Sequence, residues 1–178
     1  MTRQYRARRA LAAVAMTGAV ATGVNAGAAL ARADTDTDTT TANVEVGTAI
    51  TLSGLTESFT LSGAPGDTPT TGGTPVTMTV TTNNFAGYSV TVEPASTTLD
   101  PVIAGNTDTI NTTLLQVNGP TQSGTYAALT PGTPLEVARK TSASAEDGDT
   151  VNNDYRITIP FVRPDTYSGT LNYVAATL

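Results

Sequence analysis

Apolar residues recur at every second position along most of the chain after residue 43. The pattern is clearest in four stretches: Val76, Met78 and Val80; Tyr88, Val90 and Val92; Tyr155, Ile157, Ile159 and Phe161; and Tyr167, Leu171, Tyr173 and Ala175. A period of two places alternate side chains on one face of an extended strand, whereas an amphipathic helix repeats every three to four residues. Mostly Thr, Ser and Asn fill the intervening positions. The pattern therefore predicts strands with one buried and one solvated face.

Turn-forming residues separate these strands at intervals of about ten residues. Clusters of Gly, Pro, Asn and Asp stand at 62–67, 72–75, 83–84, 118–120, 131–132 and 163–165. Further strands are expected at 44–52, 58–61, 109–117, 126–130 and 135–139, and no helix is expected after residue 33. Short strands joined by tight turns favour one all-β domain, residues 43–178. We expect a single antiparallel β-sandwich of two sheets, immunoglobulin-like with Greek-key connections.

The expected core draws on few aromatic residues. Phe59, Phe85 and Phe161 are assigned to it together with the tyrosines, and aliphatic residues fill the remainder. Tyr155 follows three polar residues, so it is a candidate for the tyrosine corner of immunoglobulin-like domains, in which the hydroxyl bonds nearby backbone. The alternative is a half-buried strand tyrosine with its hydroxyl in water.

The first 33 residues have the pattern of an export signal. Four arginines precede an uncharged run, residues 10–31, and a small-x-small cleavage site ends at Ala33. Two alternatives stay open: an uncleaved membrane anchor, and twin-arginine export through Arg8-Arg9. A second cut after Ala26 is also open. Residues 34–42 are acidic, Thr-rich and low in complexity, which predicts a flexible segment ahead of the domain.

Composition removes several classes of function. The chain has no His, Cys or Trp, which excludes a His-dependent triad, thiol chemistry and disulfides. After the predicted cleavage, four basic residues stand against fifteen acidic ones, a net charge of −11. Such a surface repels nucleic acid and anionic membranes. The composition predicts a protein that is not an enzyme, that binds neither nucleic acid nor membrane after cleavage, and that uses no cofactor apart from the calcium considered below.

Three stretches, 84–92, 154–160 and 165–175, resemble exported bacterial surface proteins related to the WxL-domain group. The resemblance covers about residues 76–178, and the leader is similar to those of actinobacterial exports. It implies a β-sandwich at the cell surface that binds wall material or assembles with neighbouring proteins. Because the chain has no Trp, it lacks the W-x-L motif to which wall attachment in that group is credited.

One loop has the composition of a calcium site. Glu146, Asp147 and Asp149 surround Gly148, and Asp154 follows within eight residues of the first carboxylate. Calcium takes six to eight oxygen ligands, several of which this loop could supply if it folded around the ion. The alternative is a polar loop kept soluble by its charge.

These observations lead to a main hypothesis and two rivals. The main hypothesis is a secreted, non-catalytic β-sandwich of the cell surface or extracellular matrix. Its partners would be a cell-wall component, other surface proteins or a second copy, the last by edge-strand addition. The first rival is a glycan- or peptidoglycan-binding module using Tyr88, Tyr126 and Tyr167 as stacking surfaces. The second is a small secreted hydrolase. Retention at the wall by non-covalent capture and release to the medium both remain open.

Overall fold

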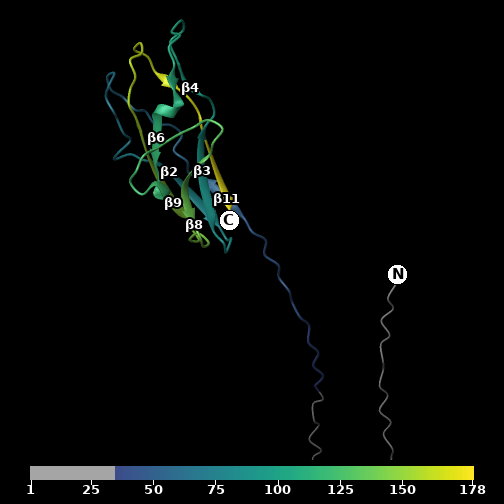
Figure 1. Ribbon diagram of the computed structural model, residues 1–178. Helices are drawn as coiled ribbons and strands as arrows, with labels where there is room; N and C mark the ends of the chain where they lie inside the picture. Colours follow the sequence, from purple (N-terminus) through teal and green to yellow (C-terminus); the bar gives the residue numbers. More distant parts are fainter. Residues whose placement is uncertain (1–34) are drawn as a thin grey trace, which may run out of the picture. The chain divides into compact units, whose positions relative to one another are not determined.

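The computed structural model describes residues 35–178 (Figure 1). The predicted signal peptide, residues 1–33, lies outside the described residues. Residues 35–49 are exposed and have no regular secondary structure. Val44–Leu178 form a compact unit, which begins one residue after the predicted domain start at Asn43. In the part of the chain that is described, no helix is both long and apolar enough to cross a membrane.

The unit is all-β, and its strands pair antiparallel. The strands are β1 (Ile50–Ser53), β2 (Val76–Thr82), β3 (Tyr88–Pro94), β4 (Thr98–Pro101), β5 (Ile110–Asn111), β6 (Leu115–Asn118), β7 (Ala127–Ala128), β8 (Leu135–Lys140), β9 (Asp149–Ile157), β10 (Tyr167–Ser168) and β11 (Leu171–Thr177). Two single-turn 3₁₀ helices, η1 (Thr112–Leu114) and η2 (Pro120–Gln122), depart from the expectation of no helix. The sheets have the orders β1-β2-β9-β6-β7, β11-β3-β8 and β10-β4-β5.

The two larger sheets bury their apolar faces in one core. β2 and β3 show strict alternation of buried and half-buried residues, which confirms the period-two prediction for both strands. Buried side chains of the five-stranded sheet come from β2, β6 and β9, and those of the sheet β11-β3-β8 come from β3 and β8. Tyr155 and Ile157 are buried as predicted. Period two was therefore a sound guide for strands in the interior of a sheet, which have a neighbouring strand on each side.

The expectation of two sheets is wrong, because the unit has three. β3 pairs with β11 as far as Leu171 and Pro94, and the pairing resumes between β4 and β10 at Ser168 and Asp100. The β3–β4 side of the ladder carries three more residues than the β10–β11 side across this gap. An insertion of this kind disrupts the ladder and bends the strands, as a β-bulge does. The small sheet is thus the displaced continuation of the β3–β11 ladder.

Several predicted strand and core positions are corrected. Residues 58–61 are not a strand, and 109–117 is broken into β5, η1 and β6. Phe85 and Phe161 are each 95% exposed rather than buried. Phe85 lies in the tight turn that the Gly87 N–H closes on the Asn84 carbonyl. Phe161 follows Pro160 in a loop, where proline supplies no donor for the ladder.

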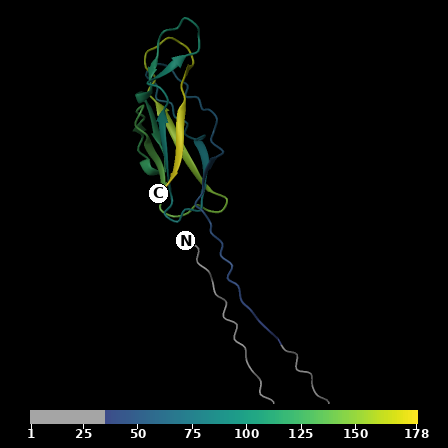
Figure 2. The ribbon, with the colours of Figure 1, turned by 90° about the vertical axis from the view of Figure 1, so that its right-hand side faces the viewer.

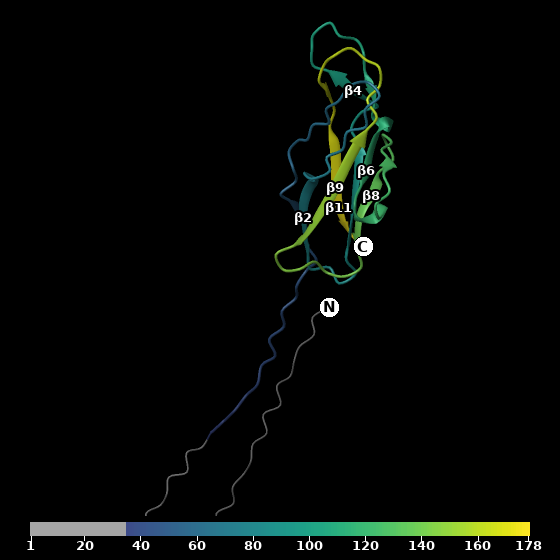
Figure 3. The ribbon, with the colours of Figure 1, turned by 90° about the vertical axis from the view of Figure 1, so that its left-hand side faces the viewer.

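β11 runs along the unit from the end that carries β4 to the opposite end, where the C-terminus lies (Figures 1 and 2). Figure 3 shows the same polarity from the other side. We call the β4 end the apex and the end with the C-terminus the base. The loop 102–109 and the loop 158–166 are at the apex. The loops 83–87 and 141–148 are at the base.

Candidate functional site

A groove with a volume of about 820 Å³ opens on the side of the unit. One rim is the irregular segment 55–65, and the other is the run 162–173, which ends in β11. The apolar side chains that line it come from all three sheets and their connections, among them Val76, Leu99, Ile110, Leu115, Ile157 and Ile159. We call this feature the lateral groove. Threonines and serines of both rims also line it, as do the charged residues Glu57, Arg163 and Asp165, so the groove combines apolar and polar surface.

The groove exists because the edge of the five-stranded sheet is short. β1 pairs only with residues 79–82 of β2, and Gly54, with φ of +61°, ends it. Beyond Gly54 the chain makes one further backbone hydrogen bond to β2, from the Thr56 amide to the Thr77 carbonyl at 3.0 Å. The chain next crosses the side of the core and returns as residues 66–71, which bond the end of β9 and the two residues that follow it. The Gly66 amide donates to the Ile159 carbonyl at 2.8 Å. Residues 57–65 therefore lie over the side of the core without a ladder of their own.

Phe59 anchors this crossing segment. Its ring stacks on Tyr155 of β9, with the ring centroids 4.6 Å apart and the planes 22° from parallel. The Tyr155 hydroxyl forms a hydrogen bond with the Tyr173 hydroxyl of β11, which joins the two larger sheets. Burial raises the pKa of both tyrosines, so both hydroxyls are neutral at physiological pH. Tyr155 is thus not a tyrosine corner, since its hydroxyl bonds a side chain of the facing sheet.

A tyrosine corner is instead formed by Tyr167 at the apex. Its hydroxyl donates to the Arg163 carbonyl, four residues upstream, at 2.9 Å. The Asn106 amide donates to the same hydroxyl, and also to Asp165. Desolvation alone would raise the pKa of Asp165. Hydrogen bonds from Asn106 and from backbone amides outweigh it and lower the pKa. The apex loops are therefore fixed beside the groove by their own polar contacts.

The outer edge of β11 borders the groove and is free of strand partners. The Ala95 amide donates to the Thr170 carbonyl, and the Leu178 amide donates to the Gly87 carbonyl. In an antiparallel ladder these bonds alternate, so even-numbered residues of β11 face β3. Leu171, Tyr173 and Ala175 consequently direct their amide and carbonyl groups away from β3. The hydrogen bonds described for residues 35–178 include none that uses these groups.

The other edge of the same sheet is protected. β8 carries Glu136, Arg139 and Lys140, and the Gln122 side chain of η2 donates to the Glu136 carbonyl at 2.8 Å. β11 has no charged residue between Leu171 and Thr177. Charges and covering elements are the devices that prevent strand addition. Of the two edges, that of β11 carries no charge, and β1 of the five-stranded sheet lies close to part of it without pairing.

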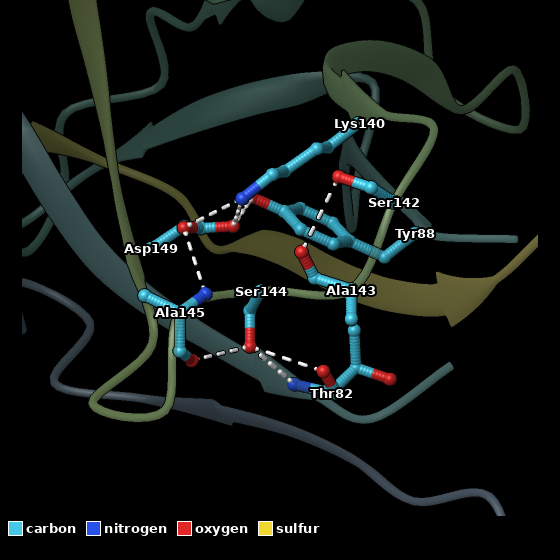
Figure 4. A network of polar contacts seen from close by, with 8 residues as sticks. All are labelled: Thr82, Tyr88, Lys140, Ser142, Ala143, Ser144, Ala145 and Asp149. Atoms are coloured by element: carbon cyan, nitrogen blue, oxygen red, sulfur yellow. Dashed lines mark hydrogen bonds and ion pairs between the residues drawn. The ribbon is translucent and has the colours of Figure 1, made fainter. Parts of the chain in front are cut away.

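A polar network closes the base (Figure 4). Lys140 of β8 donates to both carboxylate oxygens of Asp149 of β9, at 3.0 and 2.8 Å, and the Tyr88 hydroxyl donates to the same carboxylate at 3.1 Å. Burial, followed by the hydrogen bond to Asp149, raises the pKa of Tyr88 to about 12. Partial burial alone would raise the pKa of Asp149. The hydrogen bonds from Lys140, the Ala145 amide and Tyr88 outweigh this effect and lower the pKa. This network connects β3, β8 and β9.

The four residues predicted to bind calcium do not form one cluster. Glu146 and Asp147 are exposed in the 141–148 loop, whereas Asp149 is held by Lys140. Asp154 lies five residues further along β9, which is about 17 Å at the rise of an extended strand and on the opposite face. Its carboxylate accepts a hydrogen bond from Thr71 at 3.4 Å. The described residues contain no group of three or more acidic side chains placed to hold a metal ion.

The three tyrosines predicted to stack against sugar lie apart. Tyr88 is buried beside the base network, and the Arg156 guanidinium covers the ring of Tyr126 at 4.2 Å from its centroid. Tyr167 is half-buried in its corner at the apex. A sugar platform needs exposed ring faces on one surface. These residues do not provide one.

Comparisons with known proteins return no relative. No family model matches the chain, and neither a curated protein nor a solved structure matches it.

The pattern of apolar residues does not by itself reveal the groove. Phe59 was assigned to a strand of the core, and residues 54–57 were not assigned. Two signals could have indicated otherwise. Gly54 takes the position two residues after Leu52 where the alternation would place the next apolar side chain, and the apolar residues that follow, Leu55, Phe59 and Leu61, stand at odd positions instead of even ones. Such a segment covers a surface instead of pairing in a sheet.

Proposed function

We propose that this protein is exported and non-catalytic, and that it works at the cell surface or in the extracellular matrix by assembling with other protein chains. The observation that carries the proposal is the unpaired, uncharged edge of β11 beside a groove that is lined in part by apolar side chains. An exposed edge binds an added strand through backbone hydrogen bonds, and the adjoining pocket takes alternate side chains of that strand. Binding of this kind needs no catalytic residue and no cofactor.

The fold that we propose for this function is an immunoglobulin-like, Greek-key sandwich of the two larger sheets. Its support is the shared core and the repeated passage of the chain between the sheets, from β2 to β3, from β7 to β8 and from β8 to β9. Such a sandwich leaves edge strands available for partners. The relation to WxL-type surface proteins and the export by a signal peptide are part of the same proposal.

The oligomeric state in solution tests assembly. Sedimentation velocity is measured over a hundredfold range of concentration for the chain Asp34–Leu178 and for the same chain without residues 34–45. We expect larger species to accumulate with concentration in the longer chain and not in the shorter one. A longer chain that remains monomeric at the highest concentration would contradict assembly.

The glycan-binding alternative has a separate test. Incubation of the folded protein with purified cell walls, followed by sedimentation of the walls, measures capture directly. The separated and covered tyrosines lead us to expect the protein in the supernatant. Saturable capture that Tyr126→Ala removes would favour the glycan module over assembly.

A further inference from the structure

The residues just before β1 have the pattern of a strand without a sheet. Val44 and Val46 are 88% and 77% exposed, and Glu45 stands between them. In an extended conformation the two valines share one face, and Glu45 is on the other. Apolar side chains at this spacing match the alternation that buries β2 and β3 in the core. We call residues 41–47 the donor segment.

The donor segment is attached at the base of the fold. The Asn83 side chain accepts from the Ala49 amide at 2.8 Å and donates to the Gly47 carbonyl at 2.9 Å. The next residue, Asn84, donates to the Leu178 carbonyl at 3.2 Å. Gly47 is therefore held close to the C-terminal end of β11.

The groove lies toward the other end of the same strand. Leu171 is seven residues from Leu178, which is about 23 Å along a strand. Val46 and Val44 are one and three residues from the fixed Gly47, which gives them a reach of about 4 and about 10 Å between Cα atoms. The valines of a chain cannot reach the groove of that chain beside Leu171. An occupant from the donor segment has to come from another copy.

We propose that the donor segment of one copy adds as a strand to the outer edge of β11 of a second copy, with Val44 and Val46 entering the lateral groove beside Leu171 and Tyr173. This inference rests on the proposed function and names its partner. The free amide and carbonyl groups of Leu171, Tyr173 and Ala175 supply the backbone bonds. No charge on β11 opposes the incoming Glu45, whose side chain points away from the groove.

Cysteine cross-linking tests the contact, and the chain has no native cysteine to interfere. One population of Asp34–Leu178 carries Glu45→Cys, and the other carries Asn172→Cys or Val174→Cys. These three positions are exposed and would share the outer face of the extended sheet. Two positions on β11 allow for a shift of register by one pair. The matched control is Thr121→Cys, an exposed residue of η2 at the protected edge of the same sheet.

The populations are mixed under mild oxidation, and mass spectrometry identifies the joined peptides. We expect a disulfide between position 45 and position 172 or 174, little or none with position 121, and loss of the product when Val44→Asp and Val46→Asp are added to the donor. Circular dichroism and the melting temperature verify that each variant is folded. Oligomers that need residues 34–45 but form no β11 cross-link above the level of the control would overturn this contact and leave assembly standing. Monomers throughout would overturn both.

Discussion

At the scale of single residues, the base of the fold depends on one carboxylate. Asp149 accepts hydrogen bonds from Lys140, Tyr88 and the Ala145 amide, and together they lower its pKa. A carboxyl group whose pKa is lower in the folded state than in the unfolded state stabilises the fold at pH values above its unfolded pKa of about 3.9. That contribution is lost as the pH falls through the folded pKa.

Asp149→Asn is therefore expected to decrease the free energy of unfolding at pH 7 by about 1 kcal/mol, because the contact is partly exposed. The difference from the parent protein should shrink below about pH 4. Urea denaturation at pH 7 and pH 3 measures both effects. Glu136→Gln removes the more exposed ion pair with Arg139 and serves as the control, with a change of less than about 0.5 kcal/mol. An equal loss for Asp149→Asn at both pH values would contradict the electrostatic account.

Substitution of two glycines by alanine distinguishes the cost of backbone strain from the cost of steric overlap. Gly87 and Gly66 have nearly the same positive φ, +97° and +95°. A Cβ atom on Gly87 would lie 1.9 Å from the Lys140 carbonyl oxygen, whereas on Gly66 it would meet nothing within 4 Å. We expect Gly66→Ala to cost about 1 to 2 kcal/mol from strain alone and Gly87→Ala clearly more, measured by urea denaturation. Equal losses would mean that the base loops move apart without cost.

At the scale of elements, the sequence predicted strands well where side chains alternate between a core and solvent. The sequences of β2 and β3 predict these strands directly. With apolar residues at every second position, only one register places the apolar side chains on the buried face of the sheet. The third sheet could not be predicted this way. It follows from a mismatch of three residues between two strands far apart in sequence, which no local pattern contains.

The candidate site was predictable only in part. The free edge of β11 depends on which strands become neighbours, and pairing order is a property of the whole chain. The four carboxylates proposed for calcium were close in sequence, but β9 extends through Asp154 and separates them, while Lys140 engages Asp149. An extended strand places residues five apart at a distance that a loop would not.

The crossing segment 57–65 is expected to depend on Phe59. Phe59→Ala removes the ring that stacks on Tyr155 and opens the side of the core, so we expect a loss of about 2 to 3 kcal/mol in the free energy of unfolding. Phe161→Ala deletes an equal ring that is exposed, and no change is expected. Thermal and urea denaturation of both variants check this. If the two variants lost equal stability, Phe59 would not be the anchor of the segment.

At the scale of the whole molecule, the proposed contact joins two different surfaces. The donor segment lies at the base of one copy, and the β11 edge that accepts it lies toward the apex of another. Such a heterologous contact uses one surface of each copy, so the resulting pair still has one free donor and one free acceptor. Assembly then continues as an open row unless the rotation between copies closes a ring. A symmetric exchange of donor segments would instead stop at the dimer. The size distribution of the parent chain distinguishes these outcomes, since only the open row keeps growing with concentration.

Complementation between two defective chains tests the direction of this contact. One chain carries Val44→Asp and Val46→Asp, which place charges where the donor enters an apolar groove, and its β11 is intact. The other carries Ala175→Pro, which removes an outward amide of β11 without removing a bond to β3, and its donor segment is intact. Each chain alone should be monomeric in sedimentation. Their mixture has one working donor and one working acceptor, so we expect heterodimers and nothing larger. A mixture that stays monomeric while the parent chain assembles would show that the two surfaces do not bind each other.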